Sequence, residues 1–141
     1  MYFDTTYIAK YYLHEPESAS VRDLVRKADL IQSSLLAMAE FHGVLHRCLR
    51  EGSLTSVDIR GVAKRFAGDV EGGLWNLLPV SESLLRRTCA LILAVPATSF
   101  IRTGGAVHLA TANELGEREV WTNDRHMLAA APYFGLSGRS V

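Results

Sequence analysis

The chain has 141 residues, of which 48% are hydrophobic and 21% charged, as expected for a single domain with one core. Its net charge is zero, so no overall positive field attracts nucleic acid, and such contacts need a local basic patch. Apolar stretches are too short for a membrane span, and the N-terminus lacks the pattern of a signal peptide. With Cys48 and Cys89 in apolar helical patterns, we expect a cytoplasmic protein with reduced core thiols and no membrane contact.

Short buried runs alternate with stretches of helical periodicity along the whole chain. Ser34 is expected to cap the third helix, and Gly104 and Gly105 are expected to lead into the sixth. The predicted strands are 2–3, 30–33, 75–80 and 119–122, and residues 136–141 are expected to form either an edge strand or a loose tail. The predicted helices are 5–13, 17–28, 35–50, 56–70, 82–94, 106–115 and 125–131. This alternation predicts one α/β domain over residues 1–141, a three-layer α/β/α sandwich with a mostly parallel central sheet.

Three acidic residues are the candidate site. Asp4 and Asp124 each lie just past the end of a predicted strand, and Glu40 lies in an otherwise apolar helical run. Ligands of parallel sheets bind beyond the carboxyl ends of the strands, which places Asp4 and Asp124 near each other. A carboxylate among apolar neighbours is costly unless a metal, a partner or water compensates it. The three acids therefore suggest one site for a hard divalent cation, which can activate water against a phosphodiester.

Each acid also has a simpler interpretation. Asp4 and Asp124 are good helix N-caps, and Glu40 is compatible with an ordinary solvated helix position. His42 and His46 have the i,i+4 spacing of a zinc pair, but neither an HExxH motif nor a third donor accompanies them. The sequence contains no P-loop and no GxGxxG motif.

Four segments resemble one known family. They are Met1–Lys10 followed by Glu15-Pro16, Ala39-Glu40-Phe41, Arg102–Ala112 and Trp121–Arg125. Their order and spacing resemble the PIN-domain family, specifically the VapC toxins of VapBC toxin–antitoxin pairs. The resemblance implies an endoribonuclease that depends on Mg²⁺ or Mn²⁺, is neutralised by a VapB-like antitoxin and forms a homodimer.

The resemblance also implies roles for individual residues. Asp4 and Asp124 would hold the metal directly, and Glu40 would complete its coordination or position water. The hydroxyls of three threonines would orient these carboxylates. Those threonines are Thr5, Thr6 and Thr122.

The chain departs from the family at Gly105, where the family usually has Asp. His108 follows one turn later on the same helix face, but imidazole is a poor ligand for Mg²⁺. A missing acid lowers the affinity for metal and also lowers the repulsion among the remaining carboxylates. The alternative function is therefore a catalytically weakened or inactive PIN-like module that acts by binding an antitoxin. A DNA nuclease of the flap-endonuclease type is disfavoured by the compact length.

Side chains near the acids are candidates for RNA contact, although ordinary solvation or core packing explains each of them. Tyr7 and Tyr11 are candidates for stacking on an unpaired base. Apolar faces near Trp75 and Phe134 are candidates for a dimer interface. The basic candidates for RNA contact are Lys10, Arg47, Arg50, Arg102 and Arg125.

Overall fold

The computed structural model describes all residues, 1–141, as five strands, seven α-helices and one 3₁₀-helix. The strands are β1 (Tyr2–Phe3), β2 (Gln32–Ser34), β3 (Asn76–Leu78), β4 (Glu119–Trp121) and β5 (Ser137–Arg139). The helices are α1 (Thr5–Tyr12), α2 (Ser18–Lys27), α3 (Leu36–Arg50), α4 (Ser56–Glu71), α5 (Glu82–Ala94), α6 (Thr103–Glu114), α7 (Arg125–Ala130) and the 3₁₀-helix η1 (Ala131–Phe134).

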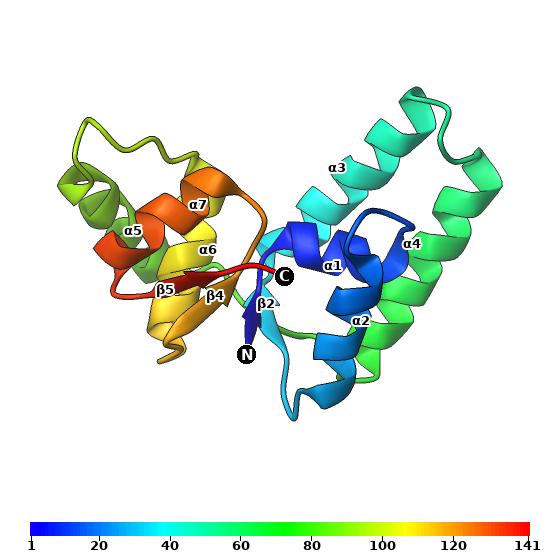
Figure 1. Ribbon diagram of the computed structural model, residues 1–141, viewed down its shortest axis with the longest axis horizontal. Coiled ribbons are helices and arrows are strands. Elements are labelled where there is room, and N and C mark those ends of the chain that lie inside the picture. Colours follow the sequence, from blue (N-terminus) through cyan, green and yellow to red (C-terminus); the bar gives the residue numbers. More distant parts are fainter.

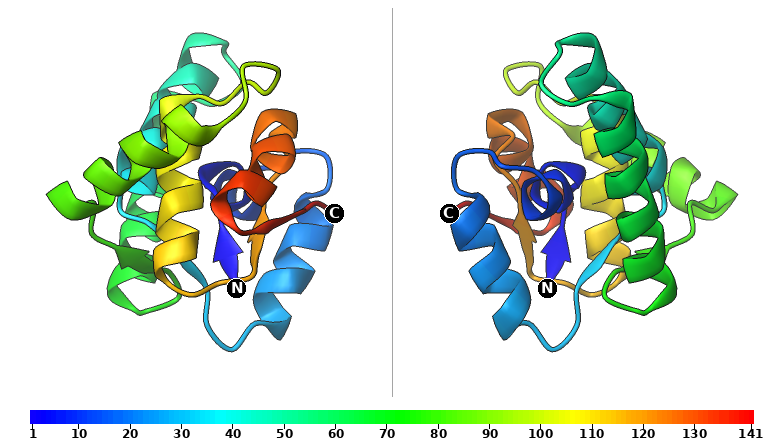
Figure 2. Two further views of the ribbon diagram at one scale, coloured as in Figure 1. Left: turned by 90° about the vertical axis from the view of Figure 1, so that its left-hand side faces the viewer. Right: turned by 90° about the vertical axis from the view of Figure 1, so that its right-hand side faces the viewer.

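The strands form one sheet in the order β3-β2-β1-β4-β5, and every pair in it is parallel. Helices α1 to α4 lie on one side of the sheet, and α5 to α7 lie on the other (Figure 1). The side views of Figure 2 show α6 and α7 covering one face. The predicted three-layer α/β/α sandwich is confirmed, and its sheet is parallel throughout.

Consecutive residues of β1 point to opposite faces of the sheet and enter two different cores. Phe3 belongs to the core beneath α1 to α4, where it packs with Phe41, Phe66 and Trp75 among others. Tyr2 belongs to the core beneath α6 and α7. Both side chains are fully buried, so the short central strand anchors both helical layers.

The middle position of β1 determines where a ligand can approach. β1 pairs with β2 on one side and with β4 on the other, so the order of the strands reverses there. In open parallel sheets, the crevice at the carboxyl ends beside such a reversal is the usual binding place. Asp4 follows β1 at this point, and Thr122 follows β4.

Two helix starts differ from the prediction. Helix α6 begins at Thr103, so Gly104 and Gly105 lie inside its first turn instead of ahead of it. Ser34 is the last residue of β2, and its hydroxyl only accepts a 3.3 Å bond from the backbone N–H of Leu36. In both places tertiary packing overrides the local preference of the residue.

Three surface predictions were wrong. Trp75 and Phe134, which were considered for a dimer face, are each 2% exposed and belong to the cores. Cys89 is exposed on α5 instead of lying in the core, while Cys48 is partly buried, and both are free thiols. No helix combines the length and the apolar character that crossing a membrane requires.

Candidate active site

A cavity of about 390 Å³ opens at the carboxyl ends of β1 and β4. Asp4, Glu40 and Asp124 all line it, although 36 and 84 residues separate them along the chain. Thr5 and Thr6 also contribute to its wall. The fold thus brings the three predicted acids into one polar cavity.

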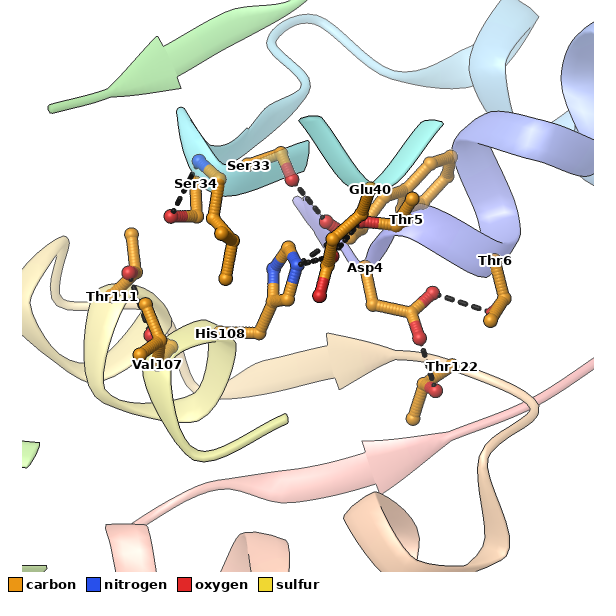
Figure 3. Close-up of polar contacts among 12 residues, drawn as sticks. Asp4, Thr5, Thr6, Ser33, Ser34, Glu40, Val107, His108, Thr111 and Thr122 are labelled. Carbon is orange, nitrogen blue, oxygen red and sulfur yellow. Dashed lines mark hydrogen bonds and ion pairs between the residues drawn. The ribbon is translucent and has the colours of Figure 1, made fainter. Parts of the chain in front are cut away.

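Asp4 is the most buried of these acids, at 3% exposure. Its Oδ1 accepts hydrogen bonds from the Thr6 hydroxyl at 2.6 Å and from the Tyr7 N–H at 3.1 Å, which caps α1. Its Oδ2 accepts a 2.6 Å bond from the Thr122 hydroxyl (Figure 3). Burial raises the pKa of Asp4 above its ordinary value, and the charge of His108 and these hydrogen bonds offset it only in part. Asp4 is therefore a carboxylate whose charge a cation would stabilise.

Glu40 reaches the cavity from α3 and is held on one oxygen. Its Oε2 accepts hydrogen bonds from the Thr5 hydroxyl and from His108 Nε2, the latter at 2.9 Å (Figure 3). Partial burial raises the pKa of Glu40, but the hydrogen bonds and charge of His108, with Thr5, outweigh it and lower the pKa overall. Its Oε1 accepts no hydrogen bond from the protein.

Asp124 lies at the start of α7 and caps it. Its Oδ1 accepts bonds from the backbone N–H groups of His126 at 2.7 Å and Met127 at 3.4 Å. Its own N–H donates to the Thr122 hydroxyl at 2.9 Å. Thr122 therefore links Asp124 to Asp4. The capping interpretation of both aspartates holds, and it coexists with their place in the cavity.

The glycine pair at the start of α6 faces this cavity. A Cβ added at Gly104 would lie 2.6 Å from Glu40 Oε1. A Cβ added at Gly105 would instead lie 2.8 Å from Met127 Cγ. An acid at 105 therefore needs Met127 to move, whereas any side chain at 104 displaces the carboxylate of Glu40.

The donor set determines which metal fits this cavity. No group of three or more His, Cys, Asp and Glu side chains converges closely enough to hold an ion by itself. Mg²⁺, however, keeps several waters and commonly binds one or two carboxylates together with substrate phosphate. Each of Asp124 and Glu40 has one oxygen that accepts no protein hydrogen bond, and Asp4 is buried beside them. The residues fit a water-rich hard cation and do not fit a closed zinc site.

The fold places some of the residues considered for RNA contact at the cavity and others in ion pairs or in the core. Arg47 and Arg102 line the cavity and are exposed. Lys10 is paired with Glu17. Tyr7 is fully buried and cannot stack on a base, which leaves core packing as its role.

One contact of the site was not predicted from the sequence. The Tyr2 hydroxyl lies 2.8 Å from His108 Nδ1, so the histidine joins the sheet to Glu40. The sequence does contain a partial signal for it, since Tyr2 lies two residues before Asp4 and His108 lies one turn after Gly105. That signal indicates that Tyr2 and His108 lie near the same site, but it does not predict that they contact each other.

The candidate site thus consists of carboxylates gathered at the carboxyl ends of strands in a parallel sheet. The sequence model of the PIN domain matches residues 1–132, and the chain belongs to this family. Among solved structures, the fold is similar to that of Mycobacterium tuberculosis VapC20, described as a toxin that cleaves the sarcin–ricin loop. The TM-score is 0.72 at 14% identity, over 92% of this chain and 93% of that chain. At this identity the likeness shows a shared fold. No curated protein sequence matches.

Proposed function

We propose that this PIN-domain protein is a metal-dependent endoribonuclease of the VapC toxin type, neutralised by a VapB-like antitoxin. The observation that carries the proposal is the gathering of Asp4, Glu40 and Asp124 in one polar cavity beside Arg47 and Arg102. The carboxylates suit a hydrated divalent cation, and the arginines suit a phosphodiester backbone. The similar fold of a toxin described as cleaving the sarcin–ricin loop supports RNA as the substrate class.

In this proposal, Asp4 and Asp124 hold Mg²⁺ or Mn²⁺, and Glu40 faces the same space from α3. The bound cation would stabilise charge on the phosphodiester and activate water. The hydroxyls of Thr6 and Thr122 keep both oxygens of Asp4 oriented, and Thr5 does the same for Glu40.

The test is cleavage of structured and unstructured RNA by purified, partner-free protein with Mg²⁺ or Mn²⁺, beside Asp4→Asn. Asn keeps the size and the capping ability of Asp4 but removes its charge. We expect cleavage by the wild type and none by Asp4→Asn, which also controls for contaminating ribonuclease. Equal activity of the two proteins would overturn the proposal.

A second candidate is a PIN module that has lost cleavage and acts only by binding an antitoxin. The glycine pair favours it, because no side chain at 104 or 105 enters the cavity and Met127 occupies the space beside Gly105. Antitoxin binding without any metal-dependent cleavage would favour this candidate. A homodimer is part of both proposals, and light scattering of the purified protein tests it.

A further inference from the structure

His108 is buried on α6, at 2% exposure, and both of its ring nitrogens have partners. Nδ1 lies 2.8 Å from the hydroxyl of Tyr2, which is fully buried in β1. Nε2 lies 2.9 Å from Glu40 Oε2 (Figure 3). A ring held from both ends cannot flip without losing both contacts. Through Tyr2, the sheet thereby fixes the orientation of the His108 ring toward the cavity.

The carboxylate of Glu40 is held on one side and free on the other. The Thr5 hydroxyl donates to the same Oε2, and Thr5 Oγ1 lies 3.1 Å from His108 Nε2, so the three polar groups form a closed triangle. Because a carboxylate only accepts, His108 Nε2 is the donor in its contact with Glu40 Oε2. Oε1 remains free for chemistry in the cavity.

The first turn of α6 leaves room for that free oxygen. A Cβ at Gly104 would come within 2.6 Å of Oε1. Any side chain at this position therefore pushes Glu40 out of the place that His108 and Thr5 give it. Helix α6 thus contributes both His108, which hydrogen-bonds to Glu40, and Gly104, whose missing side chain leaves space for Glu40 Oε1.

We propose that His108, fixed by Tyr2, is a positioning residue that holds the Glu40 carboxylate in the cavity with Oε1 free and Gly104 beside it. The consequence for cleavage rests on the proposed function, whereas the positioning itself does not. In this proposal His108, which also lines the cavity, acts on the reaction through Glu40. Loss of such a supporting hydrogen bond commonly lowers activity by roughly 10–100-fold.

The first experiment observes the positioning without any cleavage. Ring ¹⁵N resonances of the histidines are recorded in the wild type and in variants of the three partners. We expect the His108 resonances to shift in Glu40→Gln, Tyr2→Phe and Gly104→Ala, while those of His46, an exposed histidine of α3, stay unchanged. Gly105→Ala is the matched control, because its Cβ crowds Met127 instead of Glu40. His108 resonances that are identical in the wild type and Glu40→Gln would overturn the proposal.

The second experiment asks whether His108 acts through Glu40. The kcat of RNA cleavage is measured for Glu40→Gln, His108→Leu and the double variant. We expect each single change to lower kcat by roughly 10–100-fold and the double variant to be no slower than Glu40→Gln. His108→Gln, which keeps a donor amide, should recover part of the loss. Losses that multiply in the double variant would assign His108 a separate structural role and overturn the proposal.

The two experiments separate the failure of this inference from the failure of the proposed function. If the wild type cleaves RNA no faster than Asp4→Asn, the proposed function fails, and the ring resonances alone decide the positioning. If His108→Leu does not fold, as judged by circular dichroism, His108→Gln replaces it in the cycle, with the same expectation that it adds nothing to Glu40→Gln.

Discussion

The Thr122 hydroxyl donates a 2.6 Å hydrogen bond to Oδ2 of Asp4, across 118 residues of sequence. Thr122 follows β4 and Asp4 follows β1, so this bond joins the carboxyl ends of two neighbouring strands. The same hydroxyl accepts from the N–H of Asp124. One side chain thus orients a buried carboxylate and the loop that carries the next acid.

Thr122→Val should destabilise the protein by about 1.5–3 kcal/mol, because it removes a hydrogen bond to a charged, buried group without changing side-chain size. The matched control is Thr111→Val, since Thr111 is equally buried and its hydroxyl donates to the Val107 carbonyl of its own helix instead of to Asp4. Urea unfolding at neutral pH measures both. Equal losses of unfolding free energy would mean that the bond to Asp4 has no special weight.

Mn²⁺ should raise the melting temperature of the wild type and leave that of Asp4→Asn unchanged. A ligand that binds only the folded state stabilises it by about 2.7 kcal/mol at 100 times its Kd. Asp58→Asn, on the far end of the α3–α4 hairpin, is the control and should retain the full response. If Mn²⁺ shifts Asp4→Asn as much as the wild type, the ion binds elsewhere.

The sheet and the place of the acids followed from the sequence because they depend on local patterns. Strand, turn and helix alternate regularly. Asp4 directly follows β1, and Asp124 comes three residues after the end of β4, which pairs with β1. Such patterns depend on residues that are close in the sequence, so they can be recognised without knowing how the chain packs. Of the two alternatives for residues 136–141, the structure contains the edge strand, as β5.

The features that could not be predicted from the sequence depend on contacts between residues far apart in the chain. The bond from Tyr2 to His108 spans 106 residues, and only the packing of α6 on the sheet creates it. The start of α6 at Thr103 differs from the usual effect of two glycines, and these glycines lie where a Cβ would crowd Glu40 or Met127. The burial of Trp75 also depends on a distant partner, since its indole N–H donates to the Tyr12 hydroxyl on α1.

That contact leads to a prediction about the core under α1 and α4. The Tyr12 hydroxyl accepts from Trp75 Nε1 at 2.7 Å and donates to Asp69 at 2.6 Å. Tyr12→Phe leaves a buried indole N–H without a partner, which should cost about 1–3 kcal/mol of unfolding free energy. Tyr133→Phe, at an exposed position with no hydrogen bond, should cost almost nothing. Denaturant unfolding compares the two, and a cost for Tyr12→Phe as small as the control would contradict the prediction.

A pH prediction follows from the start of α4. The hydroxyl and the backbone N–H of Thr55 both donate to Asp58, at 2.6 and 2.8 Å, and lower its pKa. A carboxyl with a lowered folded-state pKa stabilises the protein above its unfolded pKa and loses that effect as the pH falls through the folded value. Asp58→Asn should therefore melt below the wild type at pH 7, with the difference shrinking in acid.

The control for that comparison is Asp29→Asn, which removes a negative charge from a residue that makes no hydrogen bond with its side chain. Its melting temperature relative to the wild type should change less between pH 7 and acid than that of Asp58→Asn. A constant difference between Asp58→Asn and the wild type across this range would show that the capping box does not depend on ionisation.

Placing an acid at position 105 tests whether the glycine at this position lowers metal affinity and activity. The Cβ of Gly105→Asp would lie 2.8 Å from Cγ and 3.3 Å from Sδ of Met127, which is 4% exposed. The single variant must therefore displace a buried side chain, whereas Gly105→Asp with Met127→Ala has room for the new carboxylate. We expect the double variant to bind Mn²⁺ more tightly than both the wild type and Gly105→Asp, because it adds a ligand and a negative charge.

Met127→Ala alone is the control, since truncating a buried Met costs about 2–5 kcal/mol and adds no ligand. Titration calorimetry measures Mn²⁺ binding, and RNA cleavage is assayed beside it. If the wild type is as silent as Asp4→Asn while the double variant cleaves RNA, the chain is a binding module descended from a nuclease. If the wild type already cleaves and the double variant is no faster, three carboxylates suffice. Unchanged Mn²⁺ affinity in the double variant would show that position 105 does not reach the metal.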